Sequence, residues 1–112
     1  MGDLDALTRA YQSGRIVNGA GGLASTAIID LRDYNDGTVG GDIHTKIHSF
    51  SMRERLRRAN GNIDNHVMWT KGASSAEAFD AMDVWLRAAK ADNSDRAPVS
   101  YTHLTLPTTP YV

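Results

Sequence analysis

Two short stretches rich in apolar and β-branched residues constrain the fold of this chain most. They are TAIIDLR at 26–32 and HVMWT at His66–Thr70, and both are predicted to be buried strands. Segments in which apolar residues recur at helical spacing lie before, between and after these two stretches. The order helix, strand, helix, strand, helix predicts an α/β fold with two neighbouring parallel strands. Because parallel strands need cover on both faces, this small sheet indicates that part of the domain is missing.

Three helices are expected around these strands. The first covers 3–12 with Asp3 as its N-cap, and the second covers 49–59 before an Asn-Gly stop signal. The third begins near Ser75, which is its expected N-cap. The residues expected to face the core are Met52, Leu56 and Ala59 in the second helix, Phe79, Met82, Leu86 and Ala89 in the third, and both Trp69 and Trp85.

Composition limits the classes of function. The 112 residues form one domain at most, and they include no cysteine, which excludes disulfides, thiol catalysis and zinc–thiolate sites. A net charge of −1 offers no overall field to attract nucleic acid. No apolar run reaches the roughly 18 residues that a membrane span needs. We therefore expect neither a nucleic-acid partner nor a membrane partner, and no motif calls for a cofactor.

The last stretch, residues 98–112, differs from everything before it. It has no acidic or basic side chain apart from His103 and no helical period, and its prolines favour an extended chain. The phrase SYTHLTLPT resembles the translation of a sequencing adapter. We therefore divide the chain into a domain fragment, 1–97, and a non-native or disordered tail, 98–112, in which His103 has no function.

A polar loop, DYNDGTVGGD, is expected directly after the first strand. Its carboxylates belong to Asp33, Asp36 and Asp42. In open α/β sheets ligands bind beyond the carboxyl ends of the strands, which is where this loop begins. Asp and Gly are also the residues that any turn uses, so the carboxylates have an alternative, purely structural explanation.

His44 and His48 follow that loop, four residues apart, a spacing that places both rings on one face of a helix. They could bind a metal with Asp42 as the third ligand, or one of them could be a triad base partnered by an aspartate of the loop. The metal hypothesis is disfavoured because the glutamate of an H-E-x-x-H motif is absent and Lys46 adds positive charge. The remaining alternative is that both side chains order the turn by bonding to backbone.

Two further motifs have structural explanations. The segment RERLRR holds four arginines: Arg53, Arg55, Arg57 and Arg58. Without aromatic platforms, these arginines predict a solvated helix face rather than a nucleic-acid surface. The segment NGAGGLAS lacks the phosphate-loop pattern and precedes a strand, so it predicts a flexible connection.

Three longer phrases carry a resemblance to a known family. They are GRIVNGAGGLASTAIIDLRDYND, GDIHTKIHSFSMRERLRRANGNIDNHVMW and AFDAMDVWLRAAKADNSD. Together, over about Leu7 to Asp95, they resemble the C-terminal part of the bacterial family of domain of unknown function 6351, which is similar to the α/β hydrolases. The resemblance implies a partial α/β-hydrolase-like three-layer sandwich. It also implies a triad in the chain order Ser, Asp, His, with Asp33 or Asp36 as the acid.

The chain departs from the hydrolase pattern in two places. No Gly-x-Ser-x-Gly turn occurs, so a serine nucleophile would lie upstream of Met1. The loop after the last strand contains no histidine, so His44, His48 or His66 would have to act as the base.

Two hypotheses follow. In the first, the chain is a truncated fragment, inactive alone, of a parent that cleaves an ester or related acyl bond. Its partners are then the missing N-terminal part and a small ester substrate, and the catalytic candidates in the parent are Asp33, Asp36, His44 and His48. In the second, the chain is a non-catalytic binding or structural module. The first hypothesis also predicts self-association through the sheet edge and apolar face that the missing strands would cover.

Overall fold

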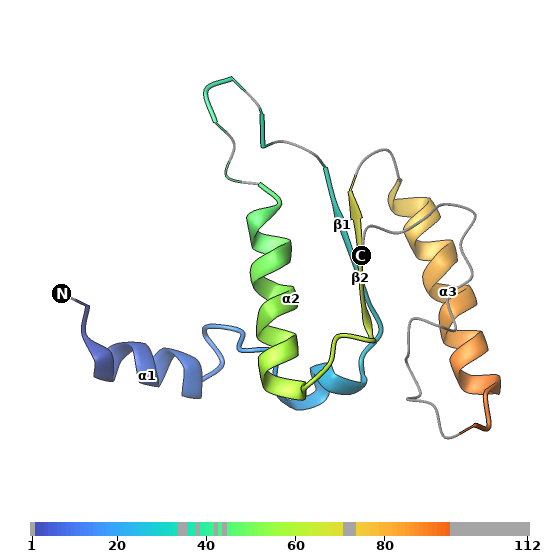
Figure 1. Ribbon diagram of the computed structural model, residues 1–112, viewed down its shortest axis with the longest axis horizontal. Helices are drawn as coiled ribbons and strands as arrows, with labels where there is room; N and C mark the ends of the chain where they lie inside the picture. The colour runs from blue at the N-terminus through green and yellow to red at the C-terminus, as the bar shows by residue number, and fades with distance from the viewer. Residues whose placement is uncertain are drawn as a thin grey trace.

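The computed structural model describes residues 2–33, 36–37, 39–41, 43, 45–70 and 74–94. Its elements, in chain order, are α1 (Leu4–Gln12), the 3₁₀ helix η1 (Gly21–Ser25), β1 (Ile28–Arg32), α2 (Ile47–Asn60), β2 (His66–Thr70) and α3 (Ser75–Ala91). The two strands pair in parallel, which confirms the predicted α/β organisation. Figure 1 shows the strand pair lying between α2 and α3. The predicted tail, 98–112, lies outside the described residues.

The register of the strands gives the sheet two chemically different faces. Ile28 lies opposite His66, and Arg32 lies opposite Thr70. Since successive side chains of a strand point to opposite faces, Asp30 and Arg32 share a face with His66. The other face carries only apolar side chains from the strand interiors: Ile29, Leu31, Val67 and Trp69. The apolar face packs against α3, and the polar face contacts α2.

The main apolar cluster lies between the apolar face and α3, and Leu56 and Met68 are also buried on the α2 side of the sheet. Trp85 is fully buried, and Trp69 and Ala81 are also buried, which confirms the prediction for the two tryptophans. The prediction that Phe79 and Leu86 face the core was wrong, because their side chains are 76% and 47% exposed. The inner face of α3 instead carries Ala78, Ala81, Met82 and Trp85, which pack in the apolar cluster with Val67 and Trp69.

The N-cap of α3 is Ser74 rather than the predicted Ser75. The Ser74 hydroxyl accepts a hydrogen bond from the backbone N–H of Glu77, and the Glu77 carboxylate accepts one from the N–H of Ser74. This reciprocal capping box satisfies two N–H groups at the start of the helix. The boundary prediction failed by one residue because both candidates are serines, and only the backbone geometry distinguishes them.

Helix α2 begins two residues before, and ends one residue after, the predicted range of 49–59. Leu56 is fully buried and Met52 is half-buried, as predicted, whereas Ala59 is exposed. The predicted stop is confirmed, because Gly61 adopts a left-handed φ of 82° and its N–H bonds to the carbonyl of Arg57. The inner face of α2 also buries Ser49, which apolar periodicity could not identify.

The glycine-rich segment before β1 is held against α2 and the start of β2. The Asn65 side chain donates to the carbonyls of Leu23 and Thr26, at 2.6 and 2.7 Å. Arg55 donates to the carbonyl of Val17 at 2.8 Å. These bonds, together with η1, correct the prediction of a flexible connection. They also explain why β1 starts at Ile28 rather than at residue 26: the Thr26 carbonyl is bound by a side chain instead of by the sheet.

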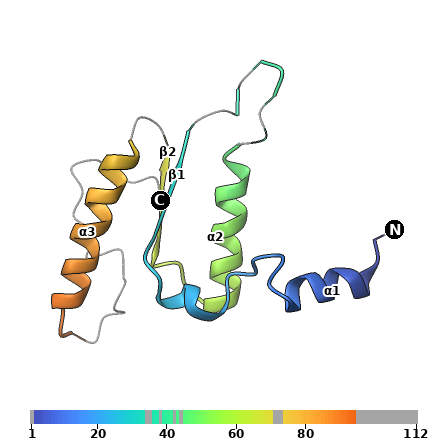
Figure 2. The same cartoon turned by 180° about the vertical axis from the view of Figure 1, so that it is seen from behind.

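Helix α1 lies beside α2 in both Figure 1 and Figure 2 and points away from the sheet. The predicted N-cap is confirmed, because the Asp3 carboxylate accepts hydrogen bonds from the N–H groups of Asp5 and Ala6. The helix contains no buried residue. Its apolar residues therefore form a stripe on the surface of the described part of the chain.

Candidate functional site

The predicted catalytic segment follows the carboxyl end of β1. Asp33 is exposed immediately after the strand. One oxygen of Asp36 accepts a 2.9 Å hydrogen bond from the backbone N–H of Lys46, and its other oxygen lies 3.9 Å from the Lys46 ammonium. Both carboxylates therefore lie in the polar loop where they were predicted, and Asp36 bridges this loop to the residue before α2.

His48 lies in the first turn of α2, and its Nε2 is 2.9 Å from the carbonyl oxygen of Ile43. Because a carbonyl only accepts hydrogen bonds, Nε2 is the donor and carries the hydrogen. In the neutral ring, Nδ1 is then the nitrogen that can accept a proton.

The described residues do not bring these candidates together as a triad. Among them, His48 has no hydrogen bond or ion pair with Asp33 or with Asp36. His44 and Asp42 lie outside the described residues. The metal hypothesis needs both of these, and within the described part no three His, Cys, Asp or Glu side chains converge on a common point.

A second group of polar side chains lies beneath the loop, between the sheet and α2. We call it the buried polar cluster, and its members are Asp30, Arg32, Ser49, Arg53 and His66. Arg32 Nε donates to Ser49 Oγ at 2.7 Å, and Arg53 Nη1 donates to the backbone carbonyl of His66 at 3.1 Å. The His66 ring is completely buried, and its Nε2 lies 3.8 Å from an Asp30 oxygen. That separation is too long for a hydrogen bond, and His66 Nε2 is buried with no hydrogen-bond partner among the described residues.

The cluster keeps Asp30 ionised. The His66 side chain makes the largest contribution to lowering the pKa of Asp30, and burial opposes it by raising that pKa. The Ser49 hydroxyl and the nearby Arg32 guanidinium lower the pKa further, and the net shift is downward. Burial also lowers the pKa of Arg53.

The arrangement in the cluster differs from a nucleophile–base–acid triad. A triad needs a serine hydroxyl bonded to a histidine, which in turn bonds to a carboxylate. Here the Ser49 hydroxyl accepts a hydrogen bond from Arg32 rather than bonding to an imidazole in the described part of the chain, and at 1% exposed it is not open to a substrate. The cluster is suited to holding elements in place and not to attacking an ester.

The sequence analysis did not identify this cluster, because the apolar content of 26–32 predicted only a buried strand. The signal that could have identified it is the spacing of two charged residues, Asp30 and Arg32, within an otherwise apolar strand. Period-two spacing places them on one face, where both must be paired.

The expectation of a solvated arginine face needs a correction at Arg53 and Arg55, which are half-buried and bond to backbone carbonyls of other segments. Arg57 and Arg58 are exposed and pair with Glu54, and these contacts lower the pKa of that carboxyl to about 2. Arg53 instead reaches beneath α2 to the start of β2. The face is therefore solvated on one side only, because α2 turns its other side towards the sheet.

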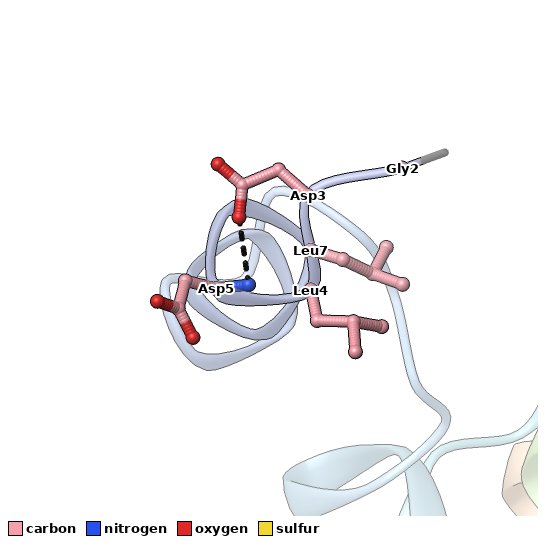
Figure 3. Close-up of a pocket in the computed structure, with 5 residues that line it drawn as sticks. All are labelled: Gly2, Asp3, Leu4, Asp5 and Leu7. Atoms are coloured by element: carbon pink, nitrogen blue, oxygen red, sulfur yellow. Dashed lines mark hydrogen bonds between the residues drawn. The ribbon is translucent and has the colours of Figure 1, made fainter.

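A hollow at the start of α1 is unrelated to these polar groups. It is lined by Gly2, Asp3, Leu4, Asp5 and Leu7. Figure 3 shows the two leucine side chains on one side of the helix and Asp5 on the other, with Asp3 bonded to the Asp5 N–H. Among the described residues, no serine and no histidine line the hollow, so we assign it to the apolar surface of α1.

In the described part of the chain, no helix has the length and apolar character to cross a membrane. No curated protein and no solved structure matches the sequence. A family model described as a tannase-like family of unknown function, DUF6351, matches residues 1–102. This description indicates a hydrolase-like family, and the match covers most of the 112 residues. The chain therefore belongs to DUF6351, the tannase-like family of unknown function.

Proposed function

We propose that this chain is the C-terminal part of an α/β-hydrolase-like enzyme that cleaves an ester or a related acyl bond. The proposal includes a three-layer sandwich in the parent, whose missing strands extend the sheet formed by β1 and β2. The partner of the chain is then the N-terminal part of its own domain, which supplies the serine nucleophile. A small ester is the substrate, with neither nucleic acid nor membrane involved.

One observation carries this proposal: a histidine held by a backbone carbonyl lies next to a loop of aspartates at the carboxyl end of a parallel strand. His48 is held at Nε2 by Ile43, which leaves Nδ1 as the proton acceptor. Ligands of open α/β sheets bind at this end of the strands. The tannase-like character of the family adds independent support.

In the proposed reaction, the histidine removes the proton from the upstream serine as the serine oxygen bonds to the ester carbonyl carbon. The same histidine then gives this proton to the alcohol as the ester bond breaks. Water hydrolyses the acyl-enzyme in a second cycle of the same kind. With His48 as the base, the Ile43 carbonyl orients the ring, and Asp33 or Asp36 would add negative charge that stabilises the imidazolium. With His44 as the alternative base, Asp33 or Asp36 would orient the ring by accepting its N–H.

The test begins with a long read across the gene, on both sides. An upstream frame that contains a Gly-x-Ser-x-Gly turn is expected. The longer protein is then purified, and hydrolysis of p-nitrophenyl acetate is compared for His48→Gln, His44→Gln, Asp33→Asn and Asp36→Asn. Loss of the base should lower kcat by about a thousandfold or more with little change in KM. Asp80→Asn, on the exposed side of α3, is the matched control.

A second candidate function is a non-catalytic binding or structural module. The observation in its favour is that Asp36 and His48 both bond to backbone groups of the same loop, as residues that only shape a turn would do. A frame confined to these 112 residues, or a longer protein in which all four substitutions leave hydrolysis unchanged, would support the module and contradict the hydrolase.

A further inference from the structure

Arg32, the last residue of β1, contacts three different parts of the chain. Its Nε donates to the Ser49 hydroxyl at 2.7 Å, and its Nη1 donates to the carbonyl of Thr45 at 3.5 Å. The same Nε lies 3.9 Å from the carboxylate of Asp30. One guanidinium therefore joins the end of the strand to the end of the polar loop and to the first turn of α2.

The geometry of the guanidinium suits this role. Its N–H donors form a rigid planar fork, so two acceptors held by it are fixed relative to one another. The base of the side chain is fixed as well, because Arg32 belongs to a paired strand and lies opposite Thr70. Ser49 is 1% exposed, which shields its bond to Arg32 from water.

The two acceptors of Arg32 are direct neighbours of the candidate catalytic contacts. Thr45 precedes Lys46, whose backbone N–H is bound by Asp36. Ser49 follows His48, whose ring is bound by the Ile43 carbonyl. Fixing Thr45 and Ser49 therefore fixes the backbone on which both contacts depend.

We infer that Arg32 is a positioning residue: it holds the exit of the polar loop and thereby sets where Asp36 and His48 lie. Asp30 supports this role from behind, because its carboxylate lies on the same strand face and pairs with the guanidinium. The effect on catalysis rests on the proposed function. The effect of Arg32 on the position of the loop is independent of the proposed function, and it can be measured on this chain alone.

The test compares Arg32→Met with Arg87→Met in the 112-residue protein. Methionine keeps much of the length of the side chain and removes every donor. Arg87 lies on the exposed side of α3, paired with Asp83, so it controls for the loss of one positive charge. In Arg32→Met the backbone N–H of Lys46 should exchange with deuterium about tenfold faster, since a charge-assisted hydrogen bond is lost. The ring-nitrogen NMR shifts of His48 should move towards a mixture of tautomers.

Amide protection of Val67 and Trp69 reports whether the core survives each substitution. Unchanged Lys46 exchange and unchanged His48 shifts in a folded Arg32→Met protein would overturn the inference. Should that variant fail to fold, Ser49→Ala decides, because it removes the acceptor of Arg32 Nε while leaving the arginine in place. Its Lys46 N–H should exchange about threefold faster, and no change there would also overturn the inference.

The catalytic consequence is measured in the longer parent protein. Arg32→Met should lower kcat by about tenfold or more while KM stays within about twofold, and Arg32→Lys should recover part of kcat. If the parent hydrolyses no ester, the proposed function is wrong, but the result for Lys46 hydrogen exchange still holds. If Lys46 hydrogen exchange is unchanged in Arg32→Met, the positioning role is wrong, but the proposed function is unaffected.

Discussion

At the scale of single residues, the most informative group is the carboxylate of Asp30. It lies on the α2 face of the sheet among two arginines, a buried histidine and a buried serine. A charge in such surroundings is stable only when it is paired. The ionised form of Asp30 therefore stabilises the fold. This stabilisation should be present at neutral pH and lost in acid.

We predict that the advantage of the wild type over Asp30→Asn disappears in acid. The folded pKa of Asp30 is lowered, chiefly by His66, from an ordinary value of 3.8. A lowered pKa stabilises the fold above the unfolded value, and this stabilisation is lost as the pH falls through the folded value. At pH 7 the substitution should cost about 1–3 kcal/mol. Urea unfolding of both proteins at several pH values between about 6 and 2 measures the difference.

Asp33→Asn removes the same charge from an exposed residue of the same segment, and it serves as the control. A difference between wild type and Asp30→Asn that stays constant through this range would contradict the prediction.

Gly19 is the second decisive residue, because its backbone touches α2. Its φ is +87°, and a Cβ there would lie 2.7 Å from backbone atoms of Arg55 and Leu56. Gly14 has a similar φ of +76° with open space around it. Gly14→Ala should therefore cost about 1–2 kcal/mol for its conformation alone. Gly19→Ala should cost clearly more, because the segment must also move away from the helix.

Thermal unfolding of the two alanine variants provides this comparison. Equal losses of stability in the two variants would contradict the prediction that the close approach of Gly19 to α2 makes Gly19→Ala the more destabilising substitution.

At the scale of elements, α3 is the helix with the best-defined beginning. Its capping box uses Ser74, although Ser75 satisfies the sequence pattern nearly as well. We predict that Ser74→Ala costs about 1 kcal/mol, since it leaves a helix N–H without its acceptor. Ser75→Ala should be neutral or slightly stabilising, because alanine is the best helix former. Chemical denaturation measures the free energy of unfolding of the two variants. A larger loss of stability for Ser75→Ala would show that Ser75 is the N-cap, as the sequence alone predicted.

At the scale of the whole molecule, the described part of the chain exposes apolar surface on α3 and along the edges of the sheet. Phe79 and Leu86 lie seven residues apart on the outer face of α3, and the sheet of two strands leaves an edge unpaired on each strand. We predict concentration-dependent self-association, measured by light scattering. Phe79→Lys with Leu86→Lys should reduce it. Ala91→Lys with Asn93→Lys adds equal charge at exposed positions without removing large apolar groups, and it should have a smaller effect. A monomer at every concentration would contradict the prediction.

Local signals in the sequence were sufficient to predict which segments are helices and which are strands. They also predicted most of the residues at which these elements begin and end. Strand β2 was predicted at its observed bounds, and the caps at Asp3 and Gly61 act as expected. Each depends on a few neighbouring residues, so the sequence carries that information directly. The family resemblance was also present in the sequence, and the family match over 1–102 confirms it.

Tertiary structure decided which face of each element is buried. The sequence predicted both Phe79 and Trp85 in the core, and the packing of α3 against the sheet buries only Trp85. The contacts of Arg32 with Ser49, of Asp30 with His66 and of His66 with Arg53 join residues up to 36 positions apart. No local pattern records such contacts, because they exist only after the strands pair and α2 packs across them. The sequence by itself determined the elements and the family, and packing between distant segments determined the core and the polar cluster beneath the candidate site.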